Sequence, residues 1–194
     1  ETDRNGKIDL KGLAALLAPL CRLLRDEVAD ALADPSSSLV HLARDWRQLL
    51  FPDASDEQFA DAYAQTVTFA LLLGRSEGAD PLTVDNAVAK LGIQHSLLSR
   101  ALQVLTDLKA RQEIAAPLDL LLRVIAAVPP VAFVGPQDPW LYFYEDFLAA
   151  YDPDLRKDAG AYYTPVEVVH AQVRLIDHLL TQRLGKPLGF ADDD

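Results

Sequence analysis

The chain has 194 residues, of which half are hydrophobic, a net charge of −11 and one cysteine. One cysteine excludes an internal disulfide, no apolar run reaches the roughly 18 residues that a membrane span needs, and an acidic chain has no broad attraction for nucleic acid. The sequence therefore predicts a cytoplasmic protein without membrane contacts. If the protein handles DNA, its main basic surface is expected outside this chain.

The sequence contains no methionine and begins with Glu1. A complete, unprocessed chain would begin with methionine, so we expect a piece of a longer protein or a processed chain.

Apolar residues recur at three- and four-residue steps, the period of amphipathic helices. In the first part of the chain they predict helices over 9–32, 39–50 and 55–73. We expect Cys21, inside the first of these, to be buried as a small apolar residue. Ser55 and Gln58 have the spacing of a capping box, which marks the start of the third helix.

Further helices are expected over 83–92, 94–112, 117–128, 140–150 and 165–184. Residues 74–81 are interpreted as a loop, and Thr83 as the cap of the helix that Gly92 ends. The prolines in 128–139 exclude a helix there, and residues 131–134 are the one candidate for a short extended segment.

This pattern predicts an all-α fold, an irregular multi-helix bundle with at least six helices, one core and no sheet of three or more strands. The core is expected to contain Trp46, Phe59, Tyr63, Val67, Leu105 and Phe147.

The sequence offers no catalytic residue and no metal site. None of its four histidines has a second ligand at metal-binding spacing, and it has neither a glycine-rich phosphate loop nor a nucleophile elbow. Asp107 and Lys109 have the spacing of a nuclease carboxylate–lysine pair, but they fall within a predicted helix and without a strand. We interpret that spacing as chance.

The stretch "GAYYTP" (160–165) interrupts the helical pattern. Thr164 is expected to cap the last helix, with Pro165 in its first position and Glu167 completing a capping box. A helix N-terminus offers free N–H groups and positive potential to an anion, and Tyr162 and Tyr163 add rings and hydroxyls. Two interpretations stay open, a plain structural joint and a site for a small molecule that carries a carboxylate.

The stretch "FYEDFLAAYDPDLRKDAGAYYTPVEVV" (143–169) resembles the segment that leads into motif X of N6-adenine DNA methyltransferases. The likeness is greatest to the large single-chain restriction–modification enzymes of type ISP and type IIG. Residues 59–75, "FADAYAQTVTFALLLGR", resemble a helix of the spacer in the same enzymes. The resemblance implies a helical spacer or coupler domain over 1–150 and the start of a methyltransferase domain over 151–194.

In this family motif X forms part of the S-adenosylmethionine pocket, around the methionine end of the cofactor. The resemblance therefore implies cofactor binding by Tyr162, Tyr163, Thr164 and Pro165. It also implies a parent enzyme, active in restriction–modification or phage defence, that methylates adenine N6 in double-stranded DNA after the base has left the stack. The remaining methyltransferase and target-recognition domains would be its partners.

The glycine-rich cofactor loop of the family and its catalytic Asn/Asp-Pro-Pro-aromatic motif do not occur in the chain, and "VPPV" (128–131) lacks the flanking residues of the latter. In the family's order both motifs follow motif X. We therefore expect a piece that ends before the methyltransferase α/β sheet, is not catalytic by itself and binds no S-adenosylmethionine on its own. The alternative is a helical protein-interaction module without a cofactor.

Four aromatic residues, Trp140, Phe143, Tyr144 and Phe147, fall on one face of the helix expected over 140–150. We expect this face to anchor the motif X segment on the spacer, with the rings buried against helices that precede residue 128. In the alternative, the face awaits another part of the enzyme and is exposed.

Overall fold

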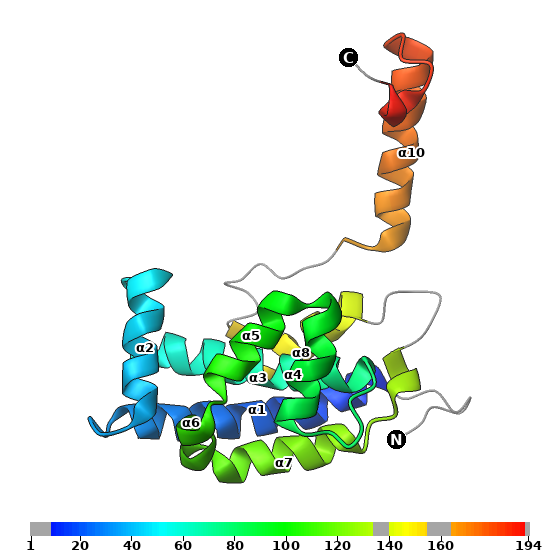
Figure 1. The fold of residues 1–194 in the computed structure, drawn as a ribbon. Helices are drawn as coiled ribbons and strands as arrows, with labels where there is room; N and C mark the ends of the chain where they lie inside the picture. Colours follow the sequence, from blue (N-terminus) through cyan, green and yellow to red (C-terminus); the bar gives the residue numbers. More distant parts are fainter. Residues whose placement is uncertain (1–8, 134–139, 155–163, 193–194) are drawn as a thin grey trace. The chain divides into compact units, whose positions relative to one another are not determined.

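The computed structural model describes residues 9–133, 140–154 and 164–192. These residues form nine α-helices and no strand, which confirms the all-α prediction (Figure 1). The chain divides into two compact units, unit 1 over Glu1–Ala159 and unit 2 over Gly160–Asp194.

Unit 1 contains eight of the α-helices and one short 3-10 turn, and its elements are α1 (Leu10–Leu32), α2 (Ser38–Leu49), α3 (Asp56–Ser76), α4 (Val84–Gln94), α5 (Ser96–Leu105), α6 (Leu108–Glu113), α7 (Ala115–Ala126), η1 (Pro130–Phe133) and α8 (Trp140–Tyr151). Unit 2 consists of α10 (Val166–Arg183) and the turn η2 (Gly189–Ala191).

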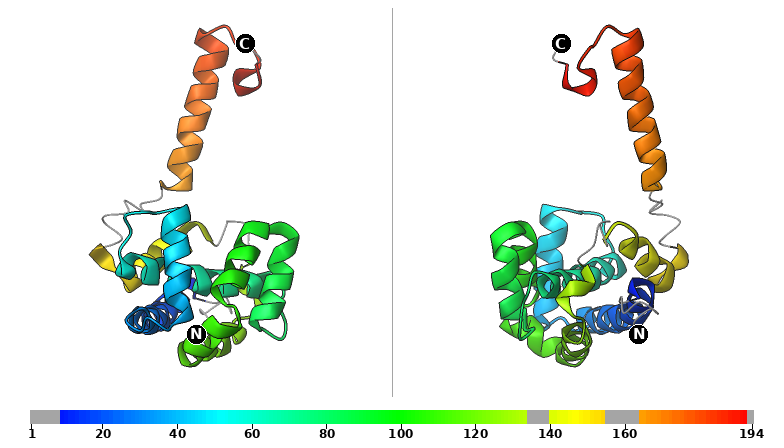
Figure 2. Two further views of the ribbon diagram at one scale, coloured as in Figure 1. Left: turned by 60° about the vertical axis from the view of Figure 1, so that its left-hand side comes forward. Right: turned by 90° about the vertical axis from the view of Figure 1, so that its right-hand side faces the viewer.

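Helix α3 lies in the middle of unit 1 and contacts α1, α4, α5 and α7. Helix α8 packs along α1. The two views of Figure 2 place α4 and α5 at one side of unit 1 and α8 at the other. The long apolar faces of α1 and α3 therefore form the centre of the core, and the two sides of unit 1 carry different helices.

The core contains most of the large side chains expected there. Phe59, Tyr63, Val67 and Phe147 are buried, as predicted, and so is Cys21. Burial raises the pKa of Cys21 to about 12, so the thiol stays protonated and unreactive near neutral pH.

Trp46 and Leu105, also expected to be largely buried, are in the intermediate range and less deeply buried than the other four. Trp46 lies at the edge of the core, against Phe59 and the exposed Phe51. The main chain of Leu105 is nevertheless tied to the core, because its carbonyl accepts a hydrogen bond from the Tyr63 hydroxyl.

The predicted capping box at the start of α3 is confirmed. The Ser55 hydroxyl accepts from the Gln58 amide at 3.1 Å, and the Gln58 side chain accepts from the Ser55 amide at 2.9 Å. Thr83 likewise caps α4, with its hydroxyl 3.1 Å from the amide of Asn86. These short polar patterns fix the starts of two helices.

Two predicted helix ends are wrong because glycine does not end either helix. Helix α3 continues to Ser76, through Gly74, and α4 continues to Gln94, through Gly92. Gly74 is buried against α4, where a Cβ atom would lie 2.7 Å from the Cβ of Ala87. Close packing of two helices therefore retains this glycine inside a helix.

The helix predicted over 94–112 is two helices, α5 and α6. Asp107 separates them, because its carboxylate accepts from the amides of Lys109 and Ala110, both at 2.9 Å, and so starts a new helix. The nuclease-like spacing of Asp107 and Lys109 thus belongs to a helix cap. Residues 131–133, expected to be extended, lie in the 3-10 turn η1.

The two helical glycines give a matched pair of substitutions with opposite expected effects. Gly74→Ala forces α3 and α4 apart, since the new methyl group meets the backbone of α4, and should lower the free energy of unfolding by about 1–3 kcal/mol. Gly92→Ala places its methyl group at an ordinary 3.7 Å from the Ser99 hydroxyl and should raise that free energy by about 0.5–1 kcal/mol. Urea denaturation measures both. Equal effects of the two substitutions would contradict the close α3–α4 contact.

Candidate functional site

Helix α8 opens the stretch that resembles the lead into motif X, and its aromatic face is buried in unit 1. Phe143 and Phe147 are 2% and 0% exposed. The ring of Phe69, on α3, makes edge-on contacts with Phe143, Tyr144 and Phe147, at centroid distances of 6.1, 5.5 and 4.9 Å. The predicted burial against an earlier helix is confirmed for Phe143 and Phe147, Tyr144 is half-buried against Phe69, and the exposed alternative is wrong for these three residues.

Trp140 was expected to pack against a helix before residue 128, but its stacking partner lies later in the chain. It is half-buried and stacks on Phe133 of η1, with the ring centroids 4.6 Å apart and the planes at 7°. Phe133 follows residue 128, so Trp140 does not contact a helix before that point through this stack. The stack instead joins the start of α8 to the turn that precedes it.

The other end of α8 is held by a charged side chain from α1. A guanidinium nitrogen of Arg22 donates to the carbonyl oxygens of Ala150 and Tyr151, at 2.7 and 2.8 Å. The last carbonyls of a helix have no partner within the helix and carry partial negative charge. Arg22 satisfies both needs at the C-terminal end of α8.

A carboxylate from α3 holds the same end of α8 through Tyr151. The Tyr151 hydroxyl donates to one oxygen of Asp61, and the Gln65 side-chain amide donates to the other at 2.8 Å. Burial, and then the hydrogen bond to Asp61, raises the pKa of Tyr151 well above its usual range, so the phenol stays protonated and keeps donating. Below, the Arg22 and Asp61 contacts together are called the α8 clamp.

The four residues predicted to bind the cofactor, 162–165, belong to unit 2. Tyr162 and Tyr163 lie outside the described residues. Thr164 and Pro165 are exposed and directly precede α10. The structure thus places two of the four predicted residues, and both lie at the start of a helix.

The capping box predicted for Thr164 and Glu167 is wrong. The residue in the N-cap position is Pro165, and no side-chain hydrogen bond caps α10. Pro165 has an extended ψ of 136°, and its carbonyl accepts from the amides of Val168 and Val169 at 2.9 and 3.1 Å. The helix therefore starts one residue later than predicted, which leaves the Thr164 hydroxyl outside the cap.

The start of α10 has polar groups that are free for a ligand. The amides of Val166 and Glu167 form no hydrogen bond to any described residue. A free hydroxyl and two free amides suit a carboxylate or another anion. The side chain of Glu167 lies in the same first turn, and its negative charge opposes an anion there.

Within unit 2, α10 has no buried residue. Its apolar side chains include Val169, Val173 and Ile176, each 40–47% exposed. At the far end of the helix, the amide of Phe190 in η2 donates to Asp177 at 3.2 Å. The described part of unit 2 thus has local order, and α10 contributes no buried side chain to it.

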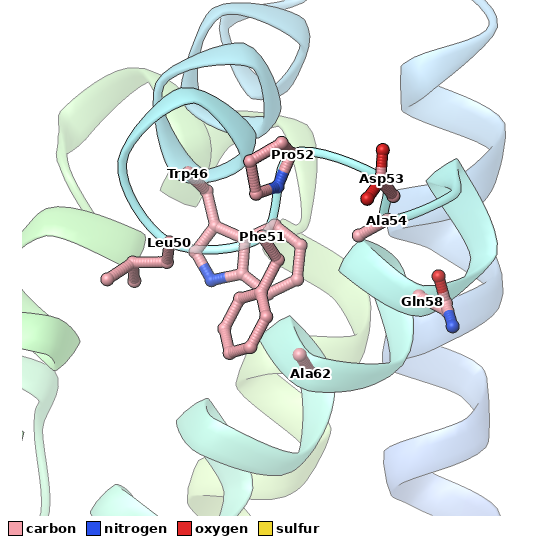
Figure 3. Close-up of a pocket in the computed structure, with 8 residues that line it drawn as sticks. All are labelled: Trp46, Leu50, Phe51, Pro52, Asp53, Ala54, Gln58 and Ala62. Carbon is pink, nitrogen blue, oxygen red and sulfur yellow. The ribbon is translucent and has the colours of Figure 1, made fainter.

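A surface cleft of about 520 Å³ opens beside the turn between α2 and α3 (Figure 3), and its lining residues are Trp46, Leu50, Phe51, Pro52, Asp53, Ala54, Gln58 and Ala62. The rings of Trp46 and Phe51 lie in contact at 4.8 Å, and Arg47 ties the turn together through the Ala54 carbonyl and Asp56. The lining is mostly apolar, and its single carboxylate, Asp53, has no partner for acid–base chemistry in the cleft.

Among the described ranges, no three histidine, cysteine or acidic side chains cluster in a way that could hold a metal ion. In the same ranges no helix is both long enough and apolar enough to cross a bilayer.

Comparison of the chain with protein-family models, curated proteins and solved structures finds no significant match.

The α8 clamp gives a prediction about stability. Arg22→Met removes both hydrogen bonds from the charged donor to the end of α8 and should lower the free energy of unfolding by about 1.5–3 kcal/mol. Arg25→Met is the control, because Arg25 lies over the Tyr151 ring at 5.7 Å and its ion pair among the described residues is with the exposed Asp26. It should cost less than about 1 kcal/mol. Urea denaturation compares the two variants, and equal costs would contradict the special role of Arg22.

Proposed function

We propose that the chain is the helical spacer and motif X segment of an S-adenosylmethionine-dependent adenine-N6 DNA methyltransferase, in a restriction–modification or phage-defence enzyme. The observation that carries this proposal is the resemblance of residues 143–169 to the lead into motif X. The resemblance covers many residue types over a continuous stretch, and so is far more specific than a short motif.

Two structural findings support the proposal. Helix α8, which opens the resembling stretch, is fixed to unit 1 at both ends, as expected for a spacer that holds the methyltransferase entry. Thr164 and Pro165, near the end of the stretch, precede a helix whose first amides are free. The proposal requires a helical spacer and a helix start that can bind the cofactor, and these two findings are consistent with that requirement.

In this proposal Thr164, Pro165 and the amides of Val166 and Glu167 hold the methionine end of the cofactor, with Tyr162 and Tyr163 beside it. The cofactor, when bound, supplies the methyl group. The chain lacks the glycine-rich loop and the catalytic Asn/Asp-Pro-Pro-aromatic motif, so the rest of the pocket and the catalytic residues must come from the remaining methyltransferase domain. Double-stranded DNA would be bound by the enzyme as a whole.

The coding sequence that follows Asp194 tests the proposal directly. A strand followed by Asp-Pro-x-x-Gly-x-Gly, and later by Asn/Asp-Pro-Pro-aromatic, is the expected result. A downstream sequence without these motifs would refute the proposal and favour the alternative, a helical interaction module without a cofactor.

Because α10 starts after Thr164, a capping role and a cofactor-binding role of this residue can be tested separately. Because its hydroxyl does not cap α10, Thr164→Ala should change the free energy of unfolding by no more than about 0.5 kcal/mol. In the intact methyltransferase the same substitution should weaken S-adenosylmethionine binding about fivefold, the usual effect of one lost hydrogen bond, and Thr164→Ser should restore it. Calorimetric titration of the cofactor measures the binding. Unchanged cofactor affinity in the alanine variant would show that Thr164 belongs to a joint and not to a site.

A further inference from the structure

Large aliphatic side chains are exposed along the α4–α5–α6 side of unit 1. Ile93, Leu97, Val104 and Leu108 are 78%, 85%, 55% and 75% exposed. Of these helices, α4 and α5 lie on the side of unit 1 away from α8 (Figure 2). None of these residues contributes to the α8 clamp or to the start of α10, so the proposed function leaves this surface unexplained.

The exposed residues of α5 form a stripe on one face of that helix. Leu97, Arg100 and Val104 are separated by three and four residues and so project from the same face. The opposite face is buried through Ser99 and Leu102, and the Ser99 hydroxyl donates to the Val88 carbonyl at 2.8 Å. The packing of α5 on α4 therefore directs the stripe outward.

Two further exposed aliphatic residues lie on the neighbouring helices. Ile93 is on α4, before the break at His95, and Leu108 is the first residue of α6, after the break at Thr106 and Asp107. Two exposed lysines lie beside these residues, Lys90 on α4 and Lys109 on α6. Below, the basic face denotes these residues together: Lys90, Ile93, Leu97, Arg100, Val104, Leu108 and Lys109.

The charge of this face is opposite to that of the chain. Residues 86–106 are the longest stretch of the sequence without aspartate or glutamate, in a chain of net charge −11. The two acidic residues that flank this stretch in the sequence are engaged elsewhere, and Glu77 lies against His95. Asp85 binds Arg111, at 2.6 and 3.3 Å, and Asp107 accepts from backbone amides of α6.

The cations of the basic face are not neutralised within the described ranges. Lys90, Arg100 and Lys109 form no ion pair there. A partner that buries the aliphatic side chains and brings negative charge next to the cations would therefore bind favourably to this surface.

We propose that the basic face binds an acidic amphipathic helix of a partner protein. The three- and four-residue spacing of the stripe matches the spacing of apolar residues on such a helix, and carboxylates beside its apolar residues would pair with Lys90, Arg100 and Lys109. Duplex DNA fits less well, because it would place phosphates against four large aliphatic side chains. A second copy of the chain, paired through the same face, would bring like charges together.

The test uses a fluorescein-labelled synthetic helical peptide with leucines on one face and glutamates on the others. A second peptide replaces every glutamate by lysine. Fluorescence anisotropy with the 194-residue chain should show the glutamate peptide binding at least about tenfold more tightly than the lysine peptide, with a difference that shrinks as salt is raised.

Substitutions locate the binding surface. Leu97→Ser and Arg100→Glu should each weaken binding of the glutamate peptide at least about tenfold. Leu50→Ser is the matched control, since Leu50 is also exposed, at 63%, but lies on the cleft beside α2, and it should leave the affinity within about twofold. All three positions are exposed, so the variants should stay folded, as circular dichroism would verify.

Equal affinity for the two peptides, no binding, or an equal loss in the Leu50→Ser variant would each overturn the proposal. Binding to phosphatidylserine vesicles without binding to the peptide would assign the face to a membrane surface instead. A concentration-dependent dimer without peptide binding would assign it to self-association. These measurements need neither cofactor nor DNA, so their failure is separate from any failure of the proposed methyltransferase role.

Discussion

Arg22 and Asp61 hold the C-terminal end of α8, and the position of this helix in unit 1 depends on them. Each comes from a helix that is otherwise largely apolar on its inner side, and each binds a group that would be costly to leave without a partner there. Arg22 satisfies the last carbonyls of α8, and Asp61 accepts from the Tyr151 hydroxyl. Aromatic packing alone would bury α8 but would not fix where it ends, because apolar contacts are not directional.

This arrangement gives the resembling stretch two parts of different character. Its first part, α8, belongs to the core of unit 1 through Phe143 and Phe147. Its last part opens α10, where the amides of Val166 and Glu167 have no hydrogen-bond partner among the described residues. A fixed spacer followed by ligand-ready polar groups is consistent with the proposed motif X role. The basic face, on the other side of unit 1, supports a separate interaction.

Much of the fold could be predicted from the sequence, because amphipathic periodicity and local caps depend on neighbouring residues. The Ser55 capping box is a clear case. The α8 clamp could not be predicted, because no sequence pattern marks Arg22 or Asp61. They contact the end of α8 only once α1, α3 and α8 have packed together. The predicted end of α3 before Gly74 is wrong because the reason for this glycine, its close packing on Ala87, lies on another helix. The candidate site depended on the resemblance, and its cap was misassigned because the extended ψ of Pro165 delays the helix by one residue.

Native-state hydrogen exchange of the 194-residue chain tests most directly whether α8 is part of the core of unit 1. If it is, the amides of Leu148 and Tyr151 should exchange with the same opening free energy as central amides of α1 and α3, such as those of Leu24 and Val67, because all must wait for unit 1 to unfold. An opening free energy for α8 more than about 2 kcal/mol lower, with α1 and α3 still protected, would contradict the account. It would show that α8 detaches on its own and cannot hold the segment that follows it.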